Sequence, residues 1–134
     1  MKPEESKEKY MKFQMMQQQM IQLQKQLEEL TQQKQELNLT ISAIKDFSET
    51  KGEKKLLTPL ASGIFMKSKI DIFDEVLVNV GNGIIVKKNP IQAIKLVEKH
   101  LIDIDQIIEQ ISQSLMQYDQ EFVNLQKELE VQNV

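Results

Sequence analysis

Few residues in this 134-residue chain have the types and spacing that catalysis or metal binding needs. His100 is the only histidine and there is no cysteine, so the nitrogen and sulfur ligands of a typical zinc site are missing. Asp103 and Asp105 are two residues apart, and such a pair points in different directions on a helix. We therefore expect no metal and no catalytic carboxylate pair. His100 is expected to be a helical residue that flanks an apolar stripe.

The remaining candidates for chemistry are glycines and serines in the middle of the chain. Gly81-Asn82-Gly83 lacks the Gly-Lys-Ser/Thr sequence of a phosphate-binding loop, and no helix follows it directly. Ser62 and Ser68 have no base nearby in the sequence. We expect neither enzyme activity nor a bound cofactor, and we interpret the two glycines as part of a hairpin turn.

Composition narrows the class of protein. Charged residues make up 28% of the chain and the formal net charge is -3, which disfavours binding to the phosphate backbone of nucleic acids. No apolar run approaches the roughly 20 residues of a membrane span. The first ten residues lack the apolar core of a secretory signal. With no cysteine either, we expect a cytoplasmic protein that binds neither nucleic acid nor membranes.

Apolar residues recur every three and four positions through the first part of the chain. The a positions are Phe13, Met20, Leu27, Lys34 and Ile41, and the d positions are Met16, Leu23, Leu30, Leu37 and Ile44. This 3.5-residue repeat predicts a coiled-coil helix over residues 4–50. Lys34 is the one charged member, and we interpret it as a register-fixing residue whose ammonium group reaches solvent.

The same spacing returns in the last third of the chain. Asn89-Pro90 is typical of a helix start, with Asn as the N-cap and Pro in the first helical position. The a and d positions that follow are Ile94, Val97, Leu101, Ile104, Ile108, Ile111, Leu115, Tyr118, Phe122, Leu125 and Leu129. We expect a helix over 90–132 that folds back on the first as an antiparallel coiled coil. Phe13 and Met16 would then lie near Phe122 and Leu125, and Ile44 near Ile94.

Between the helices the hydrophobic period changes to two, which is typical of strands. Residues 56–70 predict a hairpin with its turn near Ala61 to Gly63. Residues 75–88 predict a second hairpin, with a three-residue Gly81-Asn82-Gly83 loop and Gly83 in the left-handed conformation. The expected fold of residues 1–134 is a single domain, mainly α with a small β portion at residues 56–88.

These hairpins need cover that the helices cannot give. An isolated hairpin is marginally stable in water, and the helices use their apolar stripes on each other. Open strand edges also pair readily with other chains. We therefore expect the hairpins to mediate oligomerisation. The candidate residues are Leu57, Leu60, Ile64, Phe65, Val76, Val78, Val80, Ile84 and Val86.

The order helix, hairpin, hairpin, helix, with Thr58-Pro59-Leu60-Ala61-Ser62-Gly63 and Val78-Asn79-Val80-Gly81-Asn82-Gly83 in the hairpins, resembles the alpha class of prefoldin subunits over essentially the whole chain. The beta class has a single hairpin. The resemblance implies an ATP-independent chaperone in which two alpha and four beta subunits join their hairpins in an intersubunit β-barrel. It also implies that the coiled-coil tips hold unfolded polypeptides and deliver them to a group II chaperonin.

A tip that holds unfolded chains needs apolar residues outside the a and d positions. Tyr10, Met11, Met15, Val123 and Val131 meet this condition near the chain ends, and we predict that they contact clients. Scattered apolar residues are also normal on protein surfaces, so the same five have a purely structural interpretation.

A second interpretation of the whole chain is a structural coiled-coil protein that self-assembles through its hairpins into a filament or ring. Both interpretations need strand edges that pair with other chains, so the sequence leaves them open. The charged residues near both ends, Glu128 among them, have two interpretations as well: a chaperonin contact or an ordinary solvated face.

Overall fold

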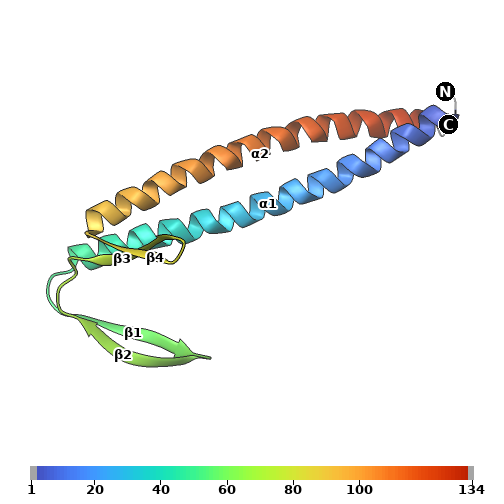
Figure 1. Ribbon diagram of the computed structural model, residues 1–134. Coiled ribbons are helices and arrows are strands. Elements are labelled where there is room, and N and C mark those ends of the chain that lie inside the picture. Colours follow the sequence, from blue (N-terminus) through green and yellow to red (C-terminus); the bar gives the residue numbers. More distant parts are fainter. Residues whose placement is uncertain (1–2, 133–134) are drawn as a thin grey trace. The chain divides into compact units, whose positions relative to one another are not determined.

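The structure, a computed structural model, describes residues 3–132 (Figure 1). Its elements follow the order α1 (Pro3–Glu49), β1 (Lys54–Ala61), β2 (Ile64–Ile70), β3 (Val76–Gly81), β4 (Ile84–Lys88) and α2 (Pro90–Gln132). The predicted mainly helical fold with two hairpins is confirmed. By contacts the chain divides into two compact units. One contains α1 up to Lys34 and α2 from Asp103 on, and the other is Gln35–Ile102.

In the first unit, α1 and α2 pack in antiparallel orientation. The Phe13 and Phe122 rings stack with their centroids 4.4 Å apart, and Lys9 forms an ion pair of 2.9 Å with Glu128. Farther along α1, Lys34 contacts a residue much earlier in α2, so the contacts run in opposite order along the two helices. The predicted proximity of Phe13 to Phe122 is confirmed, whereas that of Ile44 to Ile94 in the other unit stays a prediction.

All the a and d residues of both helices are buried or half-buried, and near the start of α2 Ala93 is buried as well. In the first unit the most buried are Met16, Ile104, Ile111 and Leu125. Most other a and d side chains are half-buried, because a two-helix pair covers only one stripe of each helix. Burial of these stripes is the main stabilisation of the helix pair, since helices in proteins are stabilised by packing of an apolar face more than by intrinsic propensity.

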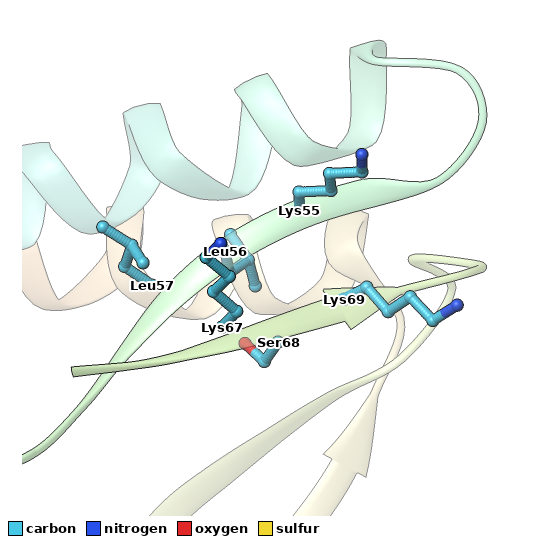
Figure 2. A pocket seen from close by; sticks show the side chains of 6 residues that line it. All are labelled: Lys55, Leu56, Leu57, Lys67, Ser68 and Lys69. Atoms are coloured by element: carbon cyan, nitrogen blue, oxygen red, sulfur yellow. The ribbon is translucent and has the colours of Figure 1, made fainter.

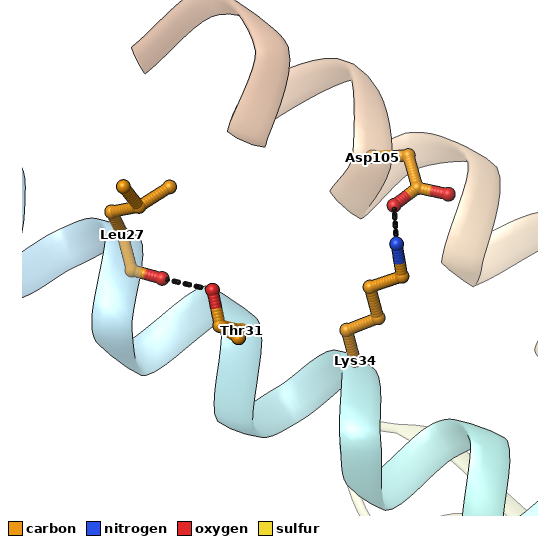
Figure 3. Close-up of polar contacts among 4 residues, drawn as sticks. All are labelled: Leu27, Thr31, Lys34 and Asp105. Carbon is orange, nitrogen blue, oxygen red and sulfur yellow. Dashed lines mark hydrogen bonds and ion pairs between the residues drawn. The ribbon is translucent and has the colours of Figure 1, made fainter. Parts of the chain in front are cut away.

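Lys34 reaches from its a position to the flank of the partner helix. Its Nζ lies 2.7 Å from Oδ1 of Asp105, and both side chains remain about half exposed (Figure 3). On the preceding turn the Thr31 hydroxyl donates to the carbonyl oxygen of Leu27 at 2.7 Å (Figure 3). The interpretation of Lys34 as a residue whose stem crosses the apolar stripe agrees with this geometry.

Lys9 extends the same arrangement toward the start of α1. It occupies the d position one heptad before Met16, and its ion pair with Glu128 lies on the flank of α2. Two ion-paired lysines therefore bracket the apolar stretch from Phe13 to Leu30. The lysine at this d position was missed in the sequence because the apolar pattern begins only at Phe13.

In the second unit the start of α2 is fixed by a reciprocal cap. The backbone N–H of Gln92 donates to Oδ1 of Asn89 at 2.8 Å, and the backbone N–H of Asn89 donates to Oε1 of Gln92 at 3.2 Å. This is the capping-box arrangement, with Gln in the third helical position. It satisfies donors that the first helical turn leaves unpaired. Just before α2, the chain forms two separate two-stranded antiparallel sheets, β1–β2 and β3–β4.

Candidate assembly surface

The two hairpins repeat one design with an offset of 20 residues. Adding 20 to each residue number turns the pair Leu57↔Lys67 into Leu77↔Lys87, and the same rule gives every pair of β3–β4. The first two pairs of β1–β2, Lys54↔Ile70 and Lys55↔Lys69, have no counterpart in the second hairpin. Even the irregularity is repeated. The register shifts between Pro59 and Ala61 in the first hairpin and between Asn79 and Gly81 in the second.

Both turns contain two residues. Ser62 and Gly63 have φ of 44° and 80°, and Asn82 and Gly83 have φ of 53° and 74°. Two successive positive φ values are the signature of the type I′ turn, whose twist matches that of a hairpin. The predicted left-handed Gly83 is confirmed, but the predicted three-residue loop is wrong. Gly81 belongs to β3, because a bulge at Val80 takes up the extra residue before the turn.

One face of each hairpin is open to solvent. Exposure alternates with period two along residues 54–59 and 67–70, and the register places Phe65 on the same open face as Leu57. Leu57 and Phe65 are 68% and 57% exposed. On the second hairpin Leu77 and Ile85 occupy the equivalent positions, 67% and 62% exposed. The opposite faces are half-buried at Leu56, Thr58, Val76, Val78 and Val86. Large apolar residues on an open sheet face are a mark of an interaction surface.

The nine predicted oligomerisation residues fall into two groups. Leu57, Leu60, Ile64, Phe65, Val80 and Ile84 are exposed, and Val76, Val78 and Val86 are half-buried. Leu77 and Ile85, which belong to the open face, were left out because the valines made the other face look more apolar. The signal was present in the sequence as the match of Leu77 to Leu57, 20 residues earlier.

The bulge residues make a second shared feature. Leu60 and Val80 have no partner in the strand register and are 61% and 52% exposed. Each stands three residues before the glycine of its turn. In addition, each two-stranded sheet has backbone groups on its outer edges that no strand of the described chain pairs with. The hairpins thus combine open apolar faces with open edges, the two properties that favour strand addition by another chain.

The five predicted client residues all lie on the surface of the first unit. Tyr10, Met11, Met15 and Val131 are more than half exposed, and Val123 is 38% exposed. Because Phe13 stacks on Phe122, the first turns of α1 and the last turns of α2 meet, and we call this end of the unit the tip. All five residues lie within one or two turns of that stack or beyond it toward the chain ends. Their role stays a prediction.

Over residues 3–132 no group of three or more His, Cys, Asp or Glu side chains is placed to hold a metal ion. His100 is exposed on α2. A hollow of about 570 Å³ lies on the first hairpin, lined by Lys55, Leu56, Leu57, Lys67, Ser68 and Lys69 (Figure 2). Within the part of the chain that the structure covers, no helix is both long and apolar enough to span a bilayer.

Comparison with known proteins gives a family. The family model described as "Prefoldin subunit" matches residues 16–133. The prefoldin subunit alpha of Thermofilum pendens is 27% identical over 74 residues, 55% of this chain and 57% of that protein. The prefoldin subunit alpha of Methanospirillum hungatei is 28% identical over 95 residues, 71% of this chain and 63% of that protein. The matched region therefore spans about three fifths of the length of these curated relatives.

A solved structure agrees in fold. It is described as a cryo-EM structure of filamentous PFD from Methanocaldococcus jannaschii, and it superposes with a TM-score of 0.73 at 19% sequence identity. The superposition covers 86% of this chain and 95% of that chain. The likeness shows that two long helices joined through two hairpins are a known arrangement. The family-model match over most of the sequence and the names of its curated relatives show that this chain belongs to the prefoldin family, as an alpha-class subunit.

Proposed function

We propose that this chain is a subunit of a cytoplasmic, ATP-independent chaperone that holds unfolded polypeptides and delivers them to a group II chaperonin. Its partners are beta-class prefoldin subunits, in a hexamer of two alpha and four beta chains. The hairpins join the subunits and the tip of each helix pair contacts the client. No step of this function requires a catalytic group or a cofactor.

The observation that carries the proposal is the pair of open apolar hairpin faces. Leu57 and Leu77 are each about two-thirds exposed on two-stranded sheets that would be marginal in water by themselves. Burying a leucine side chain contributes about 1.5–3 kcal/mol. Covering both faces with neighbouring subunits therefore contributes favourable free energy to assembly. The helices do not take part in this contact and can extend from it toward the client.

The repeat within the chain supports the proposed ratio of subunits. Each alpha chain offers two hairpins with the same register, bulge position and turn type. If each hairpin joins one subunit that has a single hairpin, two alpha chains take up four beta chains. A closed arrangement of that kind leaves no open strand edge, which is how barrels avoid unlimited pairing.

The tip has the surface that a holding chaperone needs. Tyr10, Met11 and Met15 are exposed beside the aromatic pair Phe13 and Phe122. Methionine is flexible and polarizable, so it adapts to varied apolar partners. A surface of this kind binds many unfolded polypeptides without specificity for one sequence, as a general holding function requires.

The test combines assembly with client protection. The chain is mixed with a beta-class prefoldin subunit, the mass of the complex is measured by native mass spectrometry, and aggregation of a chemically unfolded client is followed by light scattering. We expect a closed hexamer that suppresses aggregation. A variant with Tyr10, Met11, Met15, Val123 and Val131 all changed to serine should assemble normally and lose most of the suppression.

A matched control keeps the test specific. Leu39, Ile102 and Ile107 are also exposed and apolar, but they lie far along the helices from the tip residues. Their replacement by serine should leave the suppression unchanged. Equal loss in both variants would contradict the assignment of the tip. An open polymer formed by this chain alone, with no response to the beta-class subunit, would favour the filament or ring interpretation instead.

A further inference from the structure

The two hairpins share their backbone but not their charge. At the open face of β3–β4, Lys87 pairs with Glu75, the residue directly before β3, with Nζ and Oε1 3.8 Å apart. The residue that corresponds to Glu75 in the first hairpin is Lys55, and the residue that corresponds to Lys87 is Lys67. The first hairpin therefore has two lysines, Lys55 and Lys67, at the positions where the second hairpin has an ion pair.

A third lysine increases this imbalance. Lys69 stands directly opposite Lys55 in the strand register, and like charges in opposite positions destabilise a hairpin. Of the three, Lys69 has an acidic neighbour, Glu53, at 3.2 Å. Among residues 3–132 the structure gives no ion-pair partner to Lys55 or Lys67. The open face of β1–β2 is therefore cationic, and that of β3–β4 is close to neutral.

The lysines surround an apolar hollow. Lys55 on β1 and Lys67 on β2 extend toward the same side of the hairpin (Figure 2), and Leu57 stands opposite Lys67, two residues after Lys55 on β1. They line the hollow of about 570 Å³ together with Lys69 and Ser68. A ligand that fills this place must bring apolar atoms for Leu57 and negative charge for the lysines. A phosphate ion supplies the negative charge but has no apolar atoms to cover Leu57. The net charge of -3 on the whole chain disfavours nucleic acid as the ligand.

We propose that the β1–β2 face selects a partner hairpin that presents carboxylates around apolar side chains, whereas β3–β4 accepts an uncharged apolar partner. The inference rests on the proposed function and extends it, since it gives the two docking faces of one subunit different preferences. Lys55 and Lys67 are the specificity-determining residues. Complementary charge at such a contact speeds association and rejects wrong partners, and its effect weakens with salt.

The experiment measures the affinity of a beta-class prefoldin subunit for the chain at low and high salt. The double variant Lys55→Gln with Lys67→Gln removes the free charges and relieves their mutual repulsion, so the hairpin stays folded. We expect binding at low salt to weaken by about tenfold and the salt dependence to flatten. A control double variant, Lys25→Gln with Lys127→Gln, changes two exposed lysines on the helices and should behave as the unchanged chain does.

A single substitution uses the internal repeat as its guide. Lys55→Glu copies Glu75 and supplies Lys67 with an internal partner, so it should weaken binding as much as the double variant does. The charge preference can also be tested without the beta-class subunit, with two cyclic synthetic hairpin peptides. Both have the same apolar residues, and one has glutamates where the other has glutamines. The glutamate peptide should bind the unchanged chain about tenfold more tightly.

The outcomes separate this inference from the proposed function. Normal assembly with unaltered affinity and salt dependence in both lysine variants would overturn the charge selection and leave the chaperone role standing. Absence of any complex with the beta-class subunit would overturn both. Equal binding of the two peptides, or tighter binding of a single-stranded oligonucleotide than of the glutamate peptide, would also contradict the inference.

Discussion

At the scale of single residues, Lys34 shows how one charged side chain is accommodated in an apolar stripe. Its amine pairs with Asp105 at 2.7 Å, but both side chains are about half exposed, and exposed pairs contribute only about 0.2–1 kcal/mol. A leucine at this a position would bury apolar surface against the partner helix instead. We therefore expect the lysine to contribute more to the choice of register and orientation than to stability.

We predict that Lys34→Leu stabilises the helix pair by about 1 kcal/mol, because leucine burial outweighs the lost ion pair. Thermal unfolding followed by circular dichroism measures the change. Lys25→Leu, at an exposed position on the outer side of α1, should leave the midpoint nearly unaltered. A lower midpoint for Lys34→Leu would show that the ion pair is worth more than the burial it replaces.

The two turns form a natural pair for a second residue-scale prediction. Ser62 adopts φ of 44°, a conformation that asparagine tolerates and serine does not favour. We expect Ser62→Asn to stabilise the first hairpin by about 0.5–1 kcal/mol, and Asn82→Ser to destabilise the second by a similar amount. Denaturant unfolding of the assembled protein measures both, and changes of the same sign in the two variants would contradict the reasoning.

Residue-level positions differ in how well they could be predicted. The a and d residues of both helices were readable because each heptad repeats the same signal, and their burial is what the structure shows. The exposure of Leu77 could not be predicted, because β3 is short and has apolar residues on both faces. The sequence of such a strand does not indicate which face is covered by the rest of the chain. Lys9 was missed because the apolar pattern begins only at Phe13, so its place at a d position becomes clear only from its ion pair with Glu128.

At the scale of elements, the stacked rings of Phe13 and Phe122 tie the first turns of α1 to the last turns of α2. We predict that Phe122→Ala destabilises the helix pair by about 2 kcal/mol, since a half-buried ring and its aromatic contact are both lost. Met116→Ala, 66% exposed on the same helix, is the control and should change stability little. Equal effects of the two would mean that the stacked rings do not contribute.

The hairpins allow a test of face against face. Leu77 on the open face and Val78 on the half-buried face are neighbours on β3. We expect Leu77→Ser to weaken assembly at least tenfold with no loss of helix content, because it removes apolar area that a partner would cover. Val78→Ser should instead destabilise the chain itself. Analytical ultracentrifugation and circular dichroism separate the two effects, and normal assembly of Leu77→Ser would exclude the open face from the interface.

The elements themselves were largely predictable from the sequence. The start of α2 follows from Asn89-Pro90, and its cap with Gln92 is formed as such a sequence requires. The change of hydrophobic period marked both hairpins. The exact turns were not predictable, because a bulge at Val80 moves one residue from the loop into the strand without any change in the apolar pattern.

At the scale of the whole molecule, the main question is what covers the hairpins. The helices bury their apolar stripes in a coiled coil, and Leu57, Phe65, Leu77 and Ile85 remain open on the hairpins. A sequence alone indicates that such faces need a partner. It does not identify the partner, because the complementary surface belongs to another chain.

We infer that the hairpins are completed by other subunits. The most direct measurement is hydrogen–deuterium exchange at the amides of residues 54–88, read together with the native mass of the same sample, without and with a beta-class prefoldin subunit. We predict fast exchange of these amides in the lone chain and strong protection once the mass shows a complex. A lone monomer whose hairpin amides are as protected as those of the complex would contradict this inference.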